Sequence, residues 1–272
     1  MTARNGESGK SPMLLLHGFT GTPVMWDPVL PYLEMHHECV AINLPGHTGG
    51  PAFTDPKDHI ANAFVDVVEE QMDALGWERA HIVGNSLGGW LSLLLADRGR
   101  ALSTVAIAPA GGWQLNSAET RRAVRLFNQM HYSAAILRPL AIELAKRPRG
   151  RMLTLRDAVA FPERLPGPLA VQWIEAILDT PAWKLLLKNA PNVNAPTAMD
   201  GLEGHVRIAW GTKDRILPFK RYSPGWKAVL PDADWVTLEG MGHVPMSDDP
   251  ALIAKTILEV STAQTSDVVE PD

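Results

Sequence analysis

Ser86 is the residue whose surroundings most clearly suggest chemistry. It stands between two glycines in the pattern Gly84-Asn85-Ser86-Leu87-Gly88. The β-branched run before it predicts a buried strand, and the apolar residues after it recur at helical spacing. A tight strand-to-helix turn of this kind lifts a serine hydroxyl above the edge of a sheet, and its glycines allow a close backbone approach. The pattern therefore predicts a nucleophilic serine.

A serine hydroxyl attacks a carbonyl only when an oriented base lies within hydrogen-bonding reach. Of the nine histidines, His243 is best placed, because it lies in a glycine-rich loop after the last predicted strand. Asp214 follows the preceding strand, where its carboxylate could fix the imidazole tautomer and stabilise the imidazolium. We therefore predict a triad of Ser86, His243 and Asp214. Asp248 and Asp249 are expected instead to cap the final helix and charge its first turn.

Two backbone N–H groups are candidates for the oxyanion hole of such an enzyme. Leu87, the residue after the nucleophile, supplies one donor. The second donor is expected from the loop after the first strand, from Phe19 or, failing that, from Gly18. His17 and His47 are expected to be structural, with the His17 ring bracing that loop through hydrogen bonds.

The elements that must position these residues alternate between strand and helix patterns. Strands are predicted at about residues 13–16, 39–44, 81–83, 103–108, 206–210 and 235–238, and helices at about 25–34, 58–75, 87–96 and 250–260. This alternation predicts an α/β fold with a mostly parallel central sheet and helices on both faces. Active sites in such folds lie at the C-terminal ends of the strands. The polar tail, residues 261–272, is expected to be frayed.

Residues 113–204 interrupt the alternation. They carry no strand pattern, and helices are predicted there at about 117–130, 133–146, 169–178 and 180–188. A connection this long between parallel strands must be a subdomain. We therefore predict a core domain of residues 1–112 and 205–272 and a helical cap of residues 113–204 over the serine. The basic run at residues 146–151 is expected to be a solvated turn, or else a patch that attracts an anion.

Composition and charge describe an ordinary globular protein. Of the 272 residues, 46% are hydrophobic and 20% are charged, and the net charge of −5 gives no sign of a nucleic-acid-binding surface. The first residues lack the apolar segment of a signal peptide, and no apolar run approaches the length of a membrane span. The single cysteine, Cys39, allows no intrachain disulfide. We expect a cytoplasmic monomer or homodimer with a small-molecule substrate and with neither a metal ion nor an organic cofactor.

Together these motifs resemble those of the α/β-hydrolase fold over about residues 12–260. The resemblance is carried by the chain order Ser, Asp, His and by His17-Gly18-Phe19, Leu44-Pro45-Gly46-His47, Gly84-x-Ser86-x-Gly88, Gly211-Thr212-Lys213-Asp214 and Gly242-His243. It implies an eight-stranded, mostly parallel sheet with a helical cap inserted after the sixth strand. About eleven residues precede the first predicted strand, which leaves open whether the first two strands of that sheet are present.

The predicted chemistry is serine acyl transfer to water, as in a carboxylesterase. His243 deprotonates Ser86, the serine attacks an ester carbonyl, and the two N–H groups hold the oxyanion. The substrate is expected to be an ester or lactone of an apolar or aryl small molecule. An apolar pocket beneath the cap is expected to include Gly18, Trp90, Trp113, Met130, Trp173, Trp183 and Val244.

Other functions use the same residues. The run Gly84–Gly89 is similar to that of carbon–carbon bond hydrolases acting on vinylogous diketones. The segments His17–Gly21 and Leu44–His47 also resemble the menaquinone-pathway lyase of this fold, which places an arginine soon after the nucleophile, where this chain has Trp90. Arginines of the cap could compensate for that difference, and the candidates are Arg121, Arg122 and Arg125. A ligand receptor that keeps the triad and signals through cap movement is a further alternative.

Overall fold

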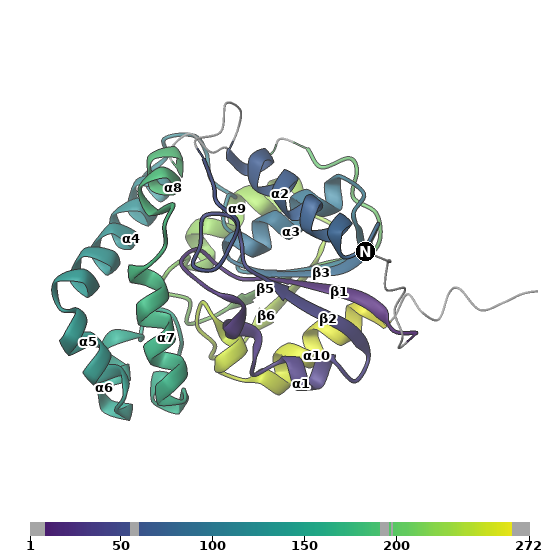
Figure 1. The fold of residues 1–272 in the computed structure, drawn as a ribbon. Helices are drawn as coiled ribbons and strands as arrows, with labels where there is room; N and C mark the ends of the chain where they lie inside the picture. The colour runs from purple at the N-terminus through teal and green to yellow at the C-terminus, as the bar shows by residue number, and fades with distance from the viewer. Residues whose placement is uncertain (1–8, 55–59, 191–195, 197, 263–272) are drawn as a thin grey trace, which may run out of the picture.

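The computed structural model describes residues 9–54, 60–190, 196 and 198–262, which fold around one parallel sheet (Figure 1). Its strands are β1 (Ser11–Leu16), β2 (His37–Ile42), β3 (Ala80–Asn85), β4 (Ala101–Ile107), β5 (Val206–Gly211) and β6 (Asp234–Leu238). They lie in the order β2-β1-β3-β4-β5-β6, and every neighbouring pair is parallel. The predicted α/β class is therefore confirmed. Within the described residues the sheet has six strands, and β1 is the first.

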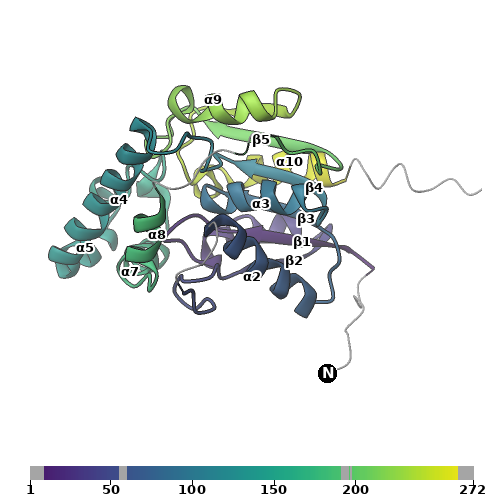
Figure 2. The ribbon, with the colours of Figure 1, turned by 90° about the horizontal axis from the view of Figure 1, so that it is seen from above.

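Alternate side chains of the strands face two separate cores. Leu14 and Leu16 of β1 pack on one side, while Met13 and Leu15 pack on the other. Figures 1 and 2 show α2, α3 and α9 over the first face and α1 and α10 over the second. These helices are α1 (Leu30–Leu33), α2 (Ile60–Ala74), α3 (Leu87–Asp97), α9 (Phe219–Val229) and α10 (Pro250–Ser261). Both faces of the sheet are thus covered, as parallel sheets require.

In the described residues, five α-helices are inserted between β4 and β5 and lie to one side of the sheet (Figures 1 and 2). We call them the cap helices: α4 (Ala118–Ile136), α5 (Arg138–Ala145), α6 (Pro148–Thr154), α7 (Gly167–Leu178) and α8 (Trp183–Asn189). Their buried side chains, such as Ala141, Trp173 and Ile174, form one cluster with the core around β1 and α10. The cap helices are therefore packed onto the core.

Prolines explain where the predicted helices differ from the observed ones. The helix predicted at 25–34 is instead a 3-10 turn, Pro23–Trp26, and the single-turn α1, with Pro28 between them. The helices predicted at 117–130 and 133–146 are α4 and α5, and their boundary lies at Leu137, two residues before Pro139. A proline lacks the N–H that a continuing helix needs and restricts the residue before it.

The basic run at residues 146–151 is exposed from Lys146 to Arg149, as expected of a solvated segment, but it is not simply a turn. From Pro148 onward it forms helix α6. Arg151 is buried, and its guanidinium donates hydrogen bonds to the carbonyl oxygens of Ala145, Pro162 and Glu163 at 3.0–3.2 Å. The arginine therefore holds together the turns that flank α6. Helix α9 was also not predicted, because Pro224 inside it interrupts the helical pattern.

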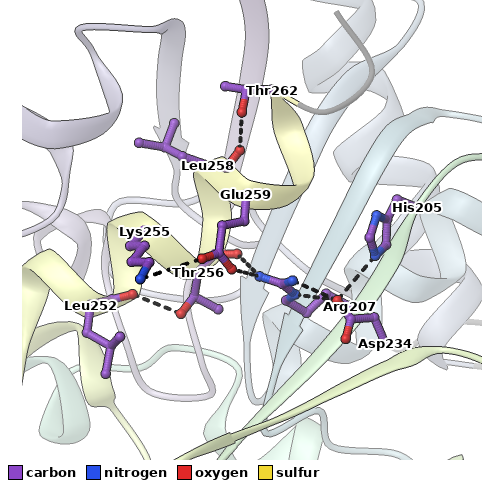
Figure 3. A network of polar contacts seen from close by, with 9 residues as sticks. All are labelled: His205, Arg207, Asp234, Leu252, Lys255, Thr256, Leu258, Glu259 and Thr262. Carbon is purple, nitrogen blue, oxygen red and sulfur yellow. Dashed lines mark hydrogen bonds and ion pairs between the residues drawn. The ribbon is translucent and has the colours of Figure 1, made fainter. Parts of the chain in front are cut away.

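A polar network stabilises the N-terminal ends of strands β5 and β6 (Figure 3). Arg207 donates hydrogen bonds to Asp234 at 2.7 Å, to Glu259 at 2.7 Å and to the Thr256 carbonyl at 2.9 Å. His205 lies 3.2 Å from Asp234. Because Glu259 and Thr256 belong to α10, the network holds that helix against the sheet.

Candidate active site

Ser86 stands on a strained turn between the last residue of β3 and the first of α3. Its φ of 57° lies in the left-handed region, which non-glycine residues rarely adopt. A Cβ at Gly84 would lie 2.0 Å from the Gly88 carbonyl oxygen, and one at Gly88 would lie 2.2 Å from the Leu16 carbonyl oxygen. Both positions therefore need glycine, as predicted for this turn. Strain of this kind costs about 1–3 kcal/mol and is held by the surrounding structure.

Asp214 and His243 form a buried pair at the same edge of the sheet. The imidazole Nδ1 of His243 lies 2.7 Å from the Asp214 carboxylate. The other carboxylate oxygen accepts hydrogen bonds from the backbone N–H groups of Ile216 and Leu217 at 2.9 and 2.7 Å. With Nδ1 donating to the carboxylate, Nε2 is left as the basic nitrogen of the ring.

Ser86 and His243 line the same hollow, about 70 Å³ in volume, which we call the histidine hollow. A second contact joins their loops. The side-chain amide of Asn85 donates a hydrogen bond to the His243 carbonyl at 2.8 Å. Asn85 is completely buried. Asn85 thus holds the loop that carries His243, which we call the histidine loop, against the strand-to-helix turn at Ser86, which we call the elbow.

The loop after β1 is braced beside the elbow. Nδ1 of His17 donates to the Gly18 carbonyl at 2.8 Å, while Nε2 accepts from the Leu44 N–H at 3.1 Å, which confirms the bracing role predicted for this ring. Burial, reinforced by the nearby His47, lowers the pKa of His17 to about 3, so the ring is neutral. In addition, the Gly88 N–H donates to the His17 carbonyl at 3.1 Å, which ties the loop to α3.

The two proposed oxyanion donors belong to the segments that this bond joins. Phe19 follows Gly18 in the braced loop, and Leu87 is the first residue of α3. Both residues line a cavity together with Ser86. In the described part of the chain, neither backbone N–H donates a hydrogen bond. Both amides are therefore available to a ligand.

This second cavity, about 90 Å³ in volume, has apolar walls. We call it the aromatic cavity because five rings line it: Phe19, Phe64, Trp90, Trp113 and Phe127. Of the predicted pocket residues, Trp90 and Trp113 line the aromatic cavity, and Gly18, Met130, Trp173 and Val244 line the histidine hollow. Trp183 lines neither and instead stacks on Phe19, with ring centroids 5.2 Å apart. Ser86 lines both the aromatic cavity and the histidine hollow.

Asp248 does not cap α10. Asp249 alone does so, by accepting the Leu252 N–H at 3.0 Å. The buried carboxylate of Asp248 instead accepts hydrogen bonds from the N–H groups of Ala160 at 2.9 Å, Phe161 at 3.0 Å and Gly242 at 2.7 Å. Burial raises its pKa, and these three bonds oppose the shift. The carboxylate thus joins the segment after α6 to the residue before His243.

Gly242 shows how closely this segment approaches the histidine loop. A Cβ there would lie 2.8 Å from the backbone of Val159 and Ala160. The Val244 N–H also donates to the Ala158 carbonyl at 2.8 Å. No local pattern near Asp248 could reveal its Ala160 and Phe161 partners, because they lie more than eighty residues away along the chain.

Neither a metal-binding cluster nor a membrane span occurs in the described residues. No three His, Cys, Asp or Glu side chains among them are grouped so that they could hold a metal ion. None of the helices in this part of the chain combines the length and the apolar character needed to cross a membrane.

Comparison with known proteins gives the family. The model of the alpha/beta hydrolase family matches residues 13–256. The chain belongs to the alpha/beta hydrolase family. It is 34% identical over 193 residues to the epoxide hydrolase EphH of Mycobacterium tuberculosis, with 71% of this chain and 90% of that protein covered. It is 24% identical over 262 residues to the monoacylglycerol lipase ABHD6 of Homo sapiens, with 93% and 76% covered.

Solved structures of this family share the fold. The 2-hydroxy-6-oxo-6-phenylhexa-2,4-dienoate hydrolase of Rhodococcus sp. strain RHA1 superposes with a TM-score of 0.70 at 21% identity. The alignment covers 94% of this chain and 92% of that one. The family membership expected from the motifs is thus confirmed, and the chain is a hydrolase of this family.

Proposed function

We propose that this hydrolase cleaves an ester or lactone of an apolar or aryl small molecule through an acyl-enzyme on Ser86. The observation that carries the proposal is the 2.7 Å contact between Asp214 and His243, beside a hollow that His243 shares with the strained Ser86. A core of residues 1–112 and 205–272 with a cap of residues 113–204 is part of the proposal.

Each residue has a defined role in this mechanism. Nε2 of His243 takes the hydroxyl proton as Ser86 attacks the carbonyl carbon, and Asp214 stabilises the imidazolium. The N–H groups of Phe19 and Leu87 hold the oxyanion. His243 then protonates the leaving alcohol and activates the water that releases the acid.

The walls of the site favour an uncharged, apolar substrate. The aromatic cavity is lined by apolar side chains apart from Ser86 and Thr120. Arg121, Arg122 and Arg125 of α4 line neither this cavity nor the histidine hollow, so these arginines do not compensate for Trp90 as a polyanion site. The lyase alternative therefore has no support from these residues.

Epoxide hydrolysis is a second candidate because of the similarity to EphH. The nucleophile argues against it. A serine that opened an epoxide would form an ether, which has no carbonyl for water to attack, so the covalent intermediate would not turn over. A carboxylate nucleophile would form an ester that water can hydrolyse. Ser86 therefore favours acyl transfer over covalent epoxide opening.

Replacing the nucleophile tests the proposal. Ser86→Ala is expected to lower kcat for p-nitrophenyl acetate by up to about 10⁶. Ser92→Ala, in the same helix α3, is the matched control because its hydroxyl donates to the Gly89 carbonyl and lines neither cavity. A fluorophosphonate should label Ser86 in the wild-type protein. Near wild-type turnover by Ser86→Ala would contradict the proposal, as would exclusive hydrolysis of a vinylogous diketone or an epoxide.

A further inference from the structure

The cap carries an apolar groove that the mechanism above does not use. Helices α4 to α7 leave an open groove of about 310 Å³ between them. Alkyl side chains dominate its walls, including Leu137, Leu140, Leu144, Leu153 and Ile174. Leu140 and Leu153 are 52% and 67% exposed. Exposed leucines gathered along one groove are unfavourable in water unless an apolar ligand covers them.

The groove adjoins the histidine hollow. Four residues line both: Met130, Thr154, Asp157 and Ile177. Asp157 is the only charged residue in the groove wall, and neither Lys nor Arg contributes to it. A chain that extends from the hollow into the groove is therefore expected to be uncharged and aliphatic. An anionic chain would meet the Asp157 carboxylate, whose Arg156 partner, 4.0 Å away, is not part of the groove wall.

The mechanism determines which part of the ester lies in the hollow. The leaving oxygen must lie close to His243, because this residue protonates it. His243 lines the histidine hollow and is absent from the wall of the aromatic cavity. The alcohol part of the ester therefore occupies the hollow, and the acyl part occupies the aromatic cavity. With about 90 Å³ and ring-lined walls, that cavity suits a compact acyl group.

We propose that the cap groove binds the alkyl chain of the alcohol, so that the enzyme prefers esters of a compact acid with a long-chain alcohol. This inference rests on the proposed function. In the reaction the Ser86 oxygen forms a bond to the acyl carbon, and the bond from that carbon to the alkoxy oxygen breaks. The serine proton passes through His243 to the alcohol, and water then releases the acid and restores the serine.

Two isomeric esters test the assignment. Heptyl acetate and methyl octanoate have the same formula, so a general preference for apolar molecules does not separate them. Full burial of a methylene is worth about 0.8 kcal/mol, and we expect about half of that in an open groove, or twofold in kcat/KM per methylene. The kcat/KM for heptyl acetate should therefore exceed that for methyl acetate by about 50-fold. Acid release is followed in a pH-stat.

Groove variants locate the effect. Leu140→Asp and Leu153→Asp place a charge in the groove wall at exposed positions, and each should reduce the ratio of kcat/KM for heptyl to methyl acetate at least tenfold. Ile136→Asp is the matched control. Ile136 is 79% exposed on α4 but is not part of the groove wall, so the ratio should stay at the wild-type value. Denaturation midpoints verify that each variant is folded.

The outcomes separate this inference from the proposed function. A larger gain for methyl octanoate than for heptyl acetate overturns the assignment of the groove to the alcohol. An unchanged ratio in the groove variants, or an equal loss in Ile136→Asp, overturns groove binding. Absence of ester hydrolysis in the wild-type protein overturns the proposed function itself.

Discussion

At the residue scale, the Asp214 carboxylate has two functions, and one substitution separates them. One oxygen accepts two backbone N–H groups and fixes its own loop, while the other faces His243. In Asp214→Asn the amide oxygen can keep the loop contacts. The amide nitrogen would then donate to Nδ1 of His243, so the proton moves to Nε2 and the ring can no longer accept the Ser86 proton.

We therefore expect Asp214→Asn to lower kcat for p-nitrophenyl acetate by about 10⁴ without unfolding the protein. Asp249→Asn is the matched control, because Asp249 is another aspartate that accepts a backbone hydrogen bond but lies at the start of α10. The rate of p-nitrophenyl acetate hydrolysis and the thermal melting temperature should be measured for both variants. A loss of activity that merely follows a loss of stability would count against the tautomer role.

Sequence reasoning could nominate residues that act alone and not those that act through distant partners. Ser86, Asp214 and His243 carry recognisable chemistry directly after strands, and the structure places the last two in contact. In the sequence, Asn85 stands out only as part of the Gly84–Gly88 motif, yet its amide binds the His243 carbonyl 158 residues away. An amide side chain has too many possible partners for its local sequence to select one.

At the element scale, Asp248 joins two segments that the chain order keeps apart. Its carboxylate holds the segment after α6 against the loop that carries His243. In Asp248→Ala three backbone N–H groups, one buried and two partly buried, would lose their acceptor. We expect a loss of unfolding free energy on the order of 3 kcal/mol. We also expect a lower kcat, because the His243 loop would no longer be fixed.

Asp249→Ala is the control for this prediction, because it removes only the cap of α10. It should cost about 1 kcal/mol and leave the ester kinetics at wild-type values. Urea denaturation followed by tryptophan fluorescence measures the first effect, and initial rates in the absence of urea measure the second. Equal kinetic effects in the two variants would show that Asp248 does not position the histidine loop.

The strands were easier to predict than the helices, for a physical reason. The strands β1, β3, β4 and β5 are short, mostly apolar and mostly buried runs, so composition alone marks them, whereas the edge strands β2 and β6 are only partly buried. Helices α5, α6 and α9 contain or begin with prolines, and their ends depend on tertiary contacts such as those of Arg151. The basic run at residues 146–151 is exposed over its first four residues, yet it ends in one buried guanidinium, that of Arg151.

At the scale of the whole molecule, four buried histidines make stability depend on pH. His17 and His47 lie beside the elbow. His37 and His81 lie at the N-terminal ends of β2 and β3, with ring centroids 4.8 Å apart. His81 contacts the Ser103 hydroxyl at 2.8 Å. Burial is the main cause that lowers all four pKa values, to about 3 for His17 and about 4 for His47 and His81.

The direction of the effect follows from proton binding. Histidines of the unfolded chain titrate near 6.5, so between pH 6.5 and about 4 the unfolded state binds more protons than the folded state. The stabilisation is fully present above pH 6.5 and is lost as the pH falls. Each such histidine contributes up to about 1.4 kcal/mol per pH unit to this loss.

We therefore expect the free energy of unfolding, measured in urea from pH 8 to pH 4.5, to fall steeply below pH 6.5. His81→Asn should reduce that slope by up to one proton, because its amide can still bond to Ser103 but does not titrate. Ser92→Ala, which changes a buried polar side chain that does not titrate, should leave the slope at the wild-type value. If the wild-type protein and His81→Asn lose stability in parallel, His81 is not among the groups that acid titrates on unfolding.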